Sequence, residues 1–249
     1  MPPAMFRTPP RYTVSLSRDP EDIRAAQALR HEVFVKELGA PDHTHGVEAD
    51  RFDEHCLHLL LRDEDQVVGT YRLLDGDGAA AAGGYYTETE YDIAPLRESG
   101  ASLLELGRSC VRSDHRGGTA LAEMWAALAR HVAKTGAGIL FGVASFHGTR
   151  TEPIAQPLAY LAANHLAPLR IRPVSRAHVP MDVLGPDAID RVAAVKALPA
   201  LVKAYLRLGG CVGDGAFVDH AFNTVDTCLV LDVRRIPASS RARNGWPSP

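Results

Sequence analysis

The sequence predicts a mixed α/β fold in which helices pack around one central sheet. Short, strongly apolar segments such as 139–145 (ILFGVAS) and 228–233 (CLVLDV) have the length and composition of buried strands. They alternate along the chain with longer segments of helical periodicity, which is the pattern of an α/β sheet. The chain has 249 residues, 46% of them hydrophobic, which is enough for a sizeable core. We expect one domain over residues 11–236, with disordered ends at 1–10 and 237–249.

The N-terminal half is expected to contain one helix and two strands. Asp19 or Asp22 could cap the helix, which runs to about Leu38 and is ended by Gly39. A polar loop reaches His55. The segments 56–62 and 66–74 are predicted strands joined by the charged turn at 63–65, and the glycine- and alanine-rich stretch 76–84 is predicted to be a loop.

The C-terminal half is expected to begin with a strand, a tight turn and an amphipathic helix. The strand covers 103–112, the turn reads SDHRGG, and the helix starts near Ala120 with a continuous apolar stripe. A buried strand at 139–145, helical segments at 153–165 and 186–207, and a last strand at 228–233 complete the prediction.

Composition and charge exclude several classes of protein. Twenty-seven basic and 30 acidic residues give a net charge of −3, so no basic excess points to nucleic acid. The first residues lack the apolar core of a signal peptide, and no apolar run approaches the ~18 residues of a membrane span, so we expect a cytoplasmic protein. The four cysteines are far apart and form no CxxC pair, which favours free, buried thiols.

The strand–turn–helix at 103–128 carries the first chemical signal. Gly117 and Gly118 permit a tight turn, and the helix that follows presents unpaired N–H groups that can bind a phosphate or the amide arm of pantetheine. An ordinary tight turn has the same composition. The candidate donor-binding residues are Cys110, Val111, Arg116, Gly117, Gly118, Thr119 and Ala120.

This arrangement resembles the thioester-binding core of GNAT-type N-acyltransferases. That family has Gln or Arg, two residues, Gly, one residue, and Gly or Ala; here His115, Gly118 and Ala120 occupy these positions. The resemblance implies a GNAT-like fold with a central twisted mixed sheet flanked by helices, and a helical C-terminal extension. The family usually binds the pyrophosphate of coenzyme A with this motif, and histidine at its first position departs from that pattern. It fits a donor that carries only phosphopantetheine, such as acyl carrier protein, and no bound cofactor is expected.

A second set of charged motifs resembles the acyl-homoserine-lactone synthases, a GNAT-like family that takes acyl groups from acyl carrier protein. RHEVF, DRFD, GTYRLL and ELGR follow one another in that family's order over residues 30–108. The residues that carry the match are Arg30, Phe34, Asp50, Asp53, Arg72, Glu105 and Arg108.

Longer segments resemble the L-ornithine Nα-acyltransferases, often labelled hemolysin-like. FDEHCLHLLLRD, GGYYTETEYD, LELGRSCVRSDHRGG and LPALVKAYLRLGG are similar to that family, and the likeness covers residues 25–233. It implies transfer of a 3-hydroxyacyl group from acyl carrier protein to the α-amine of ornithine, giving lyso-ornithine lipid. Because that product carries an acyl tail, peripheral attachment to the inner membrane face could follow. The alternatives are an acyl-homoserine-lactone synthase using S-adenosylmethionine, another N-acyl amino acid synthase, and a non-catalytic acyl-carrier or lipid-binding protein.

Attack of an amine on a thioester needs a base and a place for the oxyanion. Glu105 is the candidate base, with Arg108 beside it as the second catalytic candidate, and N–H groups where neighbouring strands diverge could hold the oxyanion. In a regular strand Glu105 and Arg108 would face opposite sides, so we predict a β-bulge near Gly107.

The six charged residues of these motifs also fit a structural ion-pair network, because charges on core elements must be paired. We expect Arg30 to pair with Asp50 or Asp53. Asp53 could instead bind the cationic side chain of ornithine.

Other polar residues have ordinary explanations. The histidines at 43, 45, 55 and 58 match no zinc spacing, so no metal is predicted, and His58 is expected to pack or hydrogen-bond in a strand. The loop 213–223 has turn composition but could close over the acceptor. A set of basic residues could dock an acidic carrier protein: Arg108, Arg112, His115, Arg116, Arg130 and Lys134.

Overall fold

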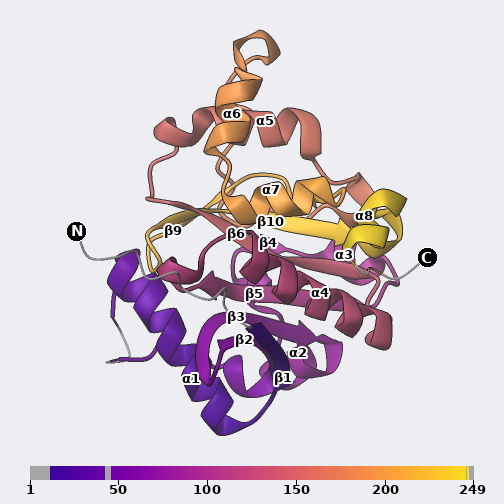
Figure 1. Cartoon of the computed structure of the whole chain (residues 1–249). Coiled ribbons are helices and arrows are strands. Elements are labelled where there is room, and N and C mark those ends of the chain that lie inside the picture. The colour runs from indigo at the N-terminus through magenta and orange to yellow at the C-terminus, as the bar shows by residue number, and fades with distance from the viewer. Residues whose placement is uncertain (1–11, 43–45, 245, 247–249) are drawn as a thin grey trace.

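The computed structural model describes residues 12–42, 46–244 and 246, and it has one large mixed sheet with helices on both faces (Figure 1). The strand order is β1-β2-β3-β5-β6-β10-β8, and β9 also pairs with β10. All neighbours are antiparallel except β5 and β6, which are parallel. The strands are β1 (Tyr12–Ser17), β2 (Leu57–Asp63), β3 (Gln66–Asp75), β5 (Leu103–Val111), β6 (Ile139–His147), β8 (Cys211–Val212), β9 (Phe217–Asp219) and β10 (Thr224–Asp232); β4 (Tyr91–Asp92) and β7 (Val174–Ser175) form a separate pair.

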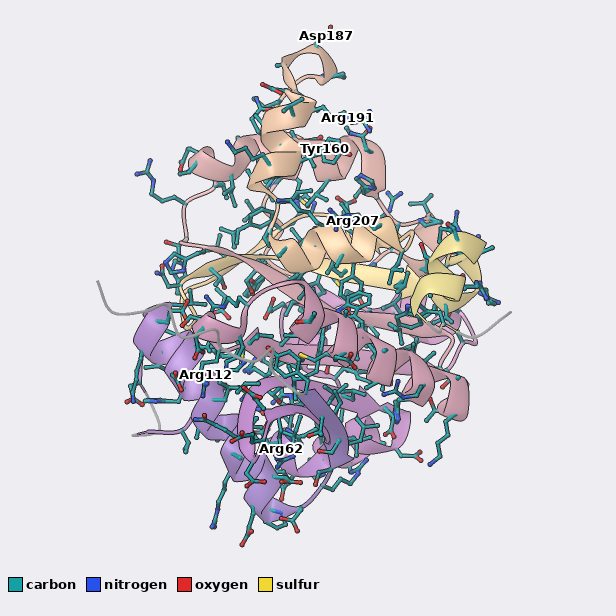
Figure 2. The ribbon with its side chains drawn as sticks, viewed as in Figure 1. Arg62, Arg112, Tyr160, Asp187, Arg191 and Arg207 are labelled. Carbon is teal, nitrogen blue, oxygen red and sulfur yellow. The ribbon has the colours of Figure 1, made fainter. Side chains whose placement is uncertain are left out.

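The helices cover the sheet and extend beyond it. α4 packs its apolar stripe, which includes Met124, Leu128 and Val132, into the larger of two main cores. In Figure 2, Tyr160 on α5 and Arg191 at the start of α6 mark a helical layer at the top of the view, beyond the sheet. The α-helices are α1 (Pro20–Arg30), α2 (Gly76–Ala82), α3 (Ala94–Glu98), α4 (Gly118–Thr135), α5 (Ala155–His165), α6 (Arg191–Ala197), α7 (Ala200–Arg207) and α8 (Ala238–Asn244). The short helical segments are η1 (His31–Glu37), η2 (Asp53–His55), η3 (Tyr86–Thr89), η4 (Ser113–His115), η5 (Glu152–Ile154), η6 (Leu169–Ile171), η7 (Pro186–Ala188) and η8 (Val233–Arg235).

The first helix begins and ends as predicted, but it changes type in the middle. The Asp19 side chain caps α1 by accepting the Glu21 N–H at 2.8 Å, and Gly39 follows the last turn with φ +76°. After Arg30 the helix continues as the π-helix η1, in which the Leu38 N–H bonds to the Val33 carbonyl. Such wider turns are frequent at functional sites, and this one carries Phe34.

Two segments differ from the predicted secondary structure. The stretch 76–84, predicted to be a loop, contains α2 because Asp75 caps it through the Gly78 N–H and four alanines favour the helix. The predicted helical segment 186–207 is two helices, α6 and α7, separated at Leu198 and Pro199. Proline cannot continue a helix and forces the residue before it into an extended conformation.

The C-terminal segment beyond residue 237 was predicted to be disordered, and that prediction is wrong for its first part. Residues 238–244 form α8, and Arg241 donates hydrogen bonds to the carbonyl oxygens of Val233 and Ile236. Trp246 is 4% exposed and packs edge-on against Trp125. This packing is a tertiary contact that the polar composition of the tail does not reveal. The predicted disorder at 1–10, 245 and 247–249 lies outside the described residues.

Strand β5 contains the predicted bulge. Thr70 pairs with Cys110 and Arg72 pairs with Gly107, so Arg108 and Ser109 together oppose the single residue Tyr71. Arg108 itself adopts the left-handed conformation with φ +51°. The bulge near Gly107 is thus confirmed, although the residue with positive φ is the arginine beside the glycine.

The sheet opens between β5 and β6. Their parallel pairing ends at Glu105 and Phe141, although both strands continue for several residues. At this point Gly142 has φ +156°, and a Cβ there would collide with the Leu106 carbonyl oxygen. Beyond Glu105 and Phe141 the two strands no longer pair with each other.

Among the described residues, no helix has both the length and the apolar character that crossing a bilayer requires.

Candidate active site

A cavity of about 270 Å³ occupies the gap where β5 and β6 diverge. Residues 105–109 of β5 form one wall, and Val143, Ala144, Ser145 and His147 of β6 form the other. Its apolar lining includes Phe34, Leu38, Tyr71, Tyr86, Leu201 and Phe222, and its polar lining includes Glu105, Arg108, Ser145, Asp219 and Asp226.

Glu105 is a buried carboxylate on the wall of this cavity. It is 4% exposed, and its two oxygens accept the N–H groups of Tyr86 at 3.0 Å and Thr87 at 2.6 Å. Burial raises the pKa of Glu105, and these N–H donors only partly oppose that effect. Since a carboxylate oxygen can accept more than one hydrogen bond, Glu105 can still take a proton from a molecule in the cavity. It also fixes η3 against β5.

The bulge brings Arg108 to the same cavity as Glu105, despite their odd spacing in the strand. Its guanidinium lies 4.4 Å from the ring centre of Tyr86 and 4.6 Å from that of Phe222. It also pairs with Glu48 and Asp50, at 3.0 Å each. Arg108 is therefore rigidly held at the cavity wall.

The predicted charge network is present. Arg30, which has no exposed surface, forms two hydrogen bonds to Asp53, at 2.8 and 2.7 Å. Asp50 pairs instead with Arg72 at 2.5 Å and with Arg108. The expected pairing of Arg30 with one of the two aspartates is thus confirmed, and the partner is Asp53.

Asp53 belongs to this network. Burial by itself raises its pKa, but hydrogen bonds and charge from Arg30, with the charge of Arg72, hold the pKa well below its usual range. Gln27 donates to the same oxygen that Arg30 Nη2 contacts. Because both oxygens are engaged and Asp53 does not line the cavity, the alternative role in binding ornithine finds no support.

Sequence reasoning missed one member of the network. Glu48 is 7% exposed and pairs with Arg30 at 2.5 Å and with Arg108. It comes from the loop between η1 and η2, where nothing in the local sequence distinguishes it from the neighbouring charged residues. Only the tertiary structure places it between two arginines.

The candidate donor turn has the expected shape. Gly117 has φ +152°, and α4 begins at Gly118 without a side-chain cap, so its first N–H groups are available for a ligand. Arg116 and Thr119 are exposed beside this end, whereas Ala120 is buried. The assignment of these residues to donor binding stays a prediction.

Cys110 and Val111 precede the turn; Cys110 is buried and Val111 is partly buried. Cys110 is 7% exposed, and burial raises the pKa of its thiol to about 12, which keeps it protonated near neutral pH. This environment is that of a structural thiol and not of a nucleophile. Val111 is partly buried against the larger core.

The predicted carrier-docking set is only partly available at the surface. Arg108 is buried in the ion-pair network, and His115 is 6% exposed, with hydrogen bonds to Tyr12 and Arg112. These two residues do not belong to a docking surface, because their polar groups are satisfied inside the protein. Arg112 pairs with Asp114, and Arg116 pairs with Glu37. Arg130 and Lys134 are exposed on α4.

His58 is buried, and its Nε2 lies 3.0 Å from the Asp53 carbonyl oxygen, which confirms the expected hydrogen bond in a strand. Residues 43 and 45, the first two histidines of the discarded zinc pattern, lie outside the described residues.

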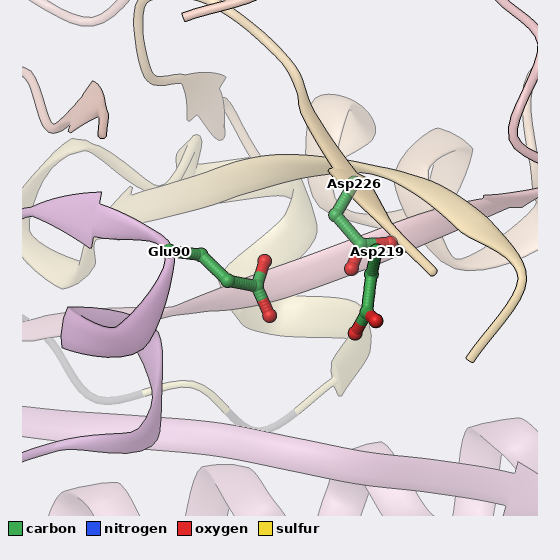
Figure 3. Close-up of side chains that lie close together, drawn as sticks. All are labelled: Glu90, Asp219 and Asp226. Carbon is green, nitrogen blue, oxygen red and sulfur yellow. The ribbon is translucent and has the colours of Figure 1, made fainter. Parts of the chain in front are cut away.

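Sequence reasoning also missed an acidic cluster beside the cavity, formed by Glu90, Asp219 and Asp226 (Figure 3). Asp219 lies in the loop that was assigned turn chemistry, and it does accept the N–H groups of Ala221 and Phe222. Asp226 could have been found from the sequence, because an aspartate inside the apolar strand TVDTCLVLD must be paired or functional.

Comparison with known proteins identifies relatives that are acyltransferases. The family model described as "Acetyltransferase (GNAT) domain" matches residues 29–126. Over 248 aligned residues the chain is 50% identical to the L-ornithine N(alpha)-acyltransferase of Rhodobacter capsulatus, covering 95% of this chain and 96% of that one. The enzyme of the same name from Brucella abortus is 39% identical over 238 residues, covering 90% and 85% of the two chains.

Solved structures share the fold at low sequence identity. FeeM, an N-acyl amino acid synthase from uncultured soil microbes, has a TM-score of 0.55 at 12% identity, covering 94% of this chain and all of that one. The AHL synthase LasI has a TM-score of 0.51 at 15% identity, covering 95% of each chain. The predicted GNAT-like fold is confirmed. Because the identity of 50% extends over nearly the full length of both chains, the protein belongs to the L-ornithine N(alpha)-acyltransferase family and is an N-acyltransferase.

Proposed function

We propose that the protein transfers a 3-hydroxyacyl group from acyl carrier protein to the α-amine of L-ornithine, giving lyso-ornithine lipid. The observation that carries this proposal is a buried carboxylate, Glu105, on the wall of the cavity between diverging strands. The full-length relatives named for ornithine Nα-acylation support the acceptor.

In the proposed reaction, the neutral α-amine attacks the thioester carbonyl carbon. A C–N bond forms and the C–S bond breaks. The amine's proton passes to Glu105, directly or through water, and Glu105 then gives it to the leaving sulfur, which departs as the thiol. Backbone N–H groups beyond the last β5–β6 pair are proposed to stabilise the oxyanion. Direct aminolysis needs no covalent enzyme intermediate, which agrees with the protonated state of the Cys110 thiol.

The donor arm is proposed to enter along the turn between β5 and α4. Arg116, Gly117 and Thr119 are exposed there, and the N-terminus of an 18-residue helix favours a phosphate. Phosphopantetheine then serves as part of the substrate, and no resident cofactor takes part in the proposed step.

The acylated product is amphipathic, so we also propose peripheral contact with the inner face of the membrane. Exposed large hydrophobic side chains support this idea, because four of them fall between residues 169 and 192. They are Leu169, Val174, Val183 and Val192, at 78%, 40%, 48% and 79% exposure.

The function is tested by mass spectrometry of purified protein incubated with 3-hydroxyacyl carrier protein and a mixture of amino acids. Acylated ornithine as the main product supports the proposal. Another acylated amine keeps N-acyl transfer and replaces the acceptor. Product with acyl coenzyme A but none with acyl carrier protein rejects the proposed donor.

Charge reversal at Arg116 tests the docking of an acidic carrier protein. We expect Arg116→Glu to weaken carrier affinity by about tenfold at low salt, and less at high salt, because it places a negative charge beside the donor turn. Arg130→Glu should act more weakly, since Arg130 lies roughly 18 Å along α4 from Gly118. Binding is measured by titration with the carrier protein.

The matched control is Arg207→Glu, an equal charge change at an exposed residue of α7, in the upper half of Figure 2. Equal losses in Arg116→Glu and Arg207→Glu would indicate a general charge effect. Unchanged affinity in Arg116→Glu and Arg130→Glu would reject this docking surface.

A further inference from the structure

Three carboxylates from different parts of the chain meet beside the cavity. Glu90 follows η3, Asp219 ends β9, and Asp226 lies in β10. One carboxylate oxygen from each lies within 4.8 Å of the others, and Figure 3 shows the side chains converging. They are 2%, 9% and 3% exposed, respectively.

Among the described residues, the hydrogen-bonding neighbours of Glu90 and Asp226, other than each other, are neutral hydroxyl groups: Tyr86 at Glu90, and Ser145 and Thr224 at Asp226. Both oxygens of Glu90 and Oδ1 of Asp226 are buried and make no hydrogen bond of good geometry. Arg108 contributes a favourable charge to Glu90, but its own ion pairs are with Glu48 and Asp50. Burying carboxylates in this way is costly unless a proton or a cation neutralises them.

The raised pKa values of Glu90 and Asp226 indicate that little positive charge lies close to the cluster. Burial raises the pKa of Glu90 and of Asp226, and nearby carboxylates raise both further. A bound cation would remove the cause of this repulsion. A positive ligand would therefore stabilise the charged form of the cluster.

The cluster opens toward the space that the reaction uses. Asp219 and Asp226 line the same cavity as Glu105 and Arg108. A ligand held by the cluster would therefore share the cavity with the proposed catalytic base.

The three carboxylates can surround one ammonium group. An ammonium nitrogen donating three tetrahedral hydrogen bonds of ~2.8 Å has acceptors up to ~4.6 Å apart. One oxygen of each carboxylate lies no more than 4.8 Å from the others, so the three residues can supply one acceptor each.

We propose that Glu90, Asp219 and Asp226 bind the side-chain ammonium of a dibasic amino-acid acceptor. This inference rests on the proposed function and names the residues that select the acceptor. Binding by carboxylates keeps the side-chain amine protonated, so it cannot act as a nucleophile. The α-amine is then the amine left free to react beside Glu105.

The test compares L-ornithine with L-norvaline, which has the same carbon chain without the terminal amine. We expect the wild-type enzyme to prefer ornithine by kcat/KM. Asp226→Asn and Glu90→Gln should each raise KM for ornithine on the order of 100-fold and leave kcat/KM for norvaline nearly unchanged. Since both replacements remove a buried carboxylate whose charged form burial disfavours, thermal stability should be equal or higher.

Asp92→Asn is the matched control. Asp92 is exposed, lies two residues after Glu90, and receives the same change of charge. It should keep the wild-type preference for ornithine.

The outcomes separate this inference from the proposed function. If the wild type acylates ornithine but Asp226→Asn and Glu90→Gln keep the wild-type preference, the function stands and the inference is overturned. If acylation fails with ornithine altogether, titration calorimetry still tests the cluster, because equal affinity for ornithine and norvaline overturns it. If chelation abolishes activity, a divalent metal restores it, and Asp226→Asn has lost stoichiometric metal, the cluster is a metal site and the inference is also overturned.

Discussion

Glu105→Gln is expected to lower kcat for acyl transfer by about 100-fold or more, because the amide cannot take the proton of the attacking amine. Initial rates with acyl carrier protein and ornithine measure this loss. KM for ornithine should change much less, since the proposed acceptor contacts lie at a different cluster.

The pH profile gives a second readout at Glu105. Burial raises the pKa of Glu105, and only its deprotonated form can act as a base. The wild-type kcat should therefore fall as the pH drops through a value above the ordinary glutamate range, and Glu105→Gln should lack this dependence.

A structural role for Glu105 must be separated from a catalytic one, because its carboxylate also anchors η3. Glu88→Gln is the matched control. Glu88 accepts the Tyr85 N–H at 2.7 Å and pairs with Arg97, but it does not line the cavity between β5 and β6. Comparable losses of kcat in Glu88→Gln and Glu105→Gln would assign Glu105 to anchoring alone.

Arg30→Met is expected to lower the free energy of unfolding by about 3–5 kcal/mol near neutral pH. Arg30 has no exposed surface and links Asp53 to Glu48, so its loss leaves two buried carboxylates with incomplete neutralisation. Urea unfolding of the two proteins measures the difference.

Acid should reduce this difference. The folded-state pKa of Asp53 is depressed by its arginine partners, so its stabilising contribution is present above the unfolded-state pKa of ~3.9. That contribution is lost as the pH falls from there toward the folded-state value. The gap between wild type and Arg30→Met should therefore narrow below about pH 4.

Arg62→Met is the control for the same chemical change at a partly exposed ion pair. Arg62 pairs with Asp22 at 2.5 Å, and both side chains are about a quarter exposed (22% and 26%). Solvent screening should limit its effect to about 1 kcal/mol or less. If Arg30→Met cost no more than Arg62→Met, the buried network would not be a main determinant of stability.

Elements with local signals could be predicted from the sequence. Asp19 and Gly39 mark the ends of the first helix, since a cap and a left-handed turn depend on neighbouring residues. The odd spacing of Glu105 and Arg108, with Gly107 between them, predicted a bulge that the structure contains. The alternation of strands and helices also predicted the fold class, because each strand or helix has its own local pattern of apolar residues.

Features that depend on distant segments could not be predicted. Asp50 and Asp53 are three residues apart, and only their packing decides that Arg30 pairs with Asp53 while Arg72 pairs with both aspartates. The ordering of α8 likewise accompanies the contact of Trp246 with Trp125, more than a hundred residues away.

The sequence by itself determined the fold class, the ends of the first helix, the bulge in β5 and the family to which the chain belongs, because each is encoded in local patterns or extended similarity. The tertiary structure alone decided how the charges are partnered and that Glu90, Asp219 and Asp226 converge beside Glu105. The physical reason is that electrostatic pairing and desolvation depend on distances in space, which strand register and loop packing set.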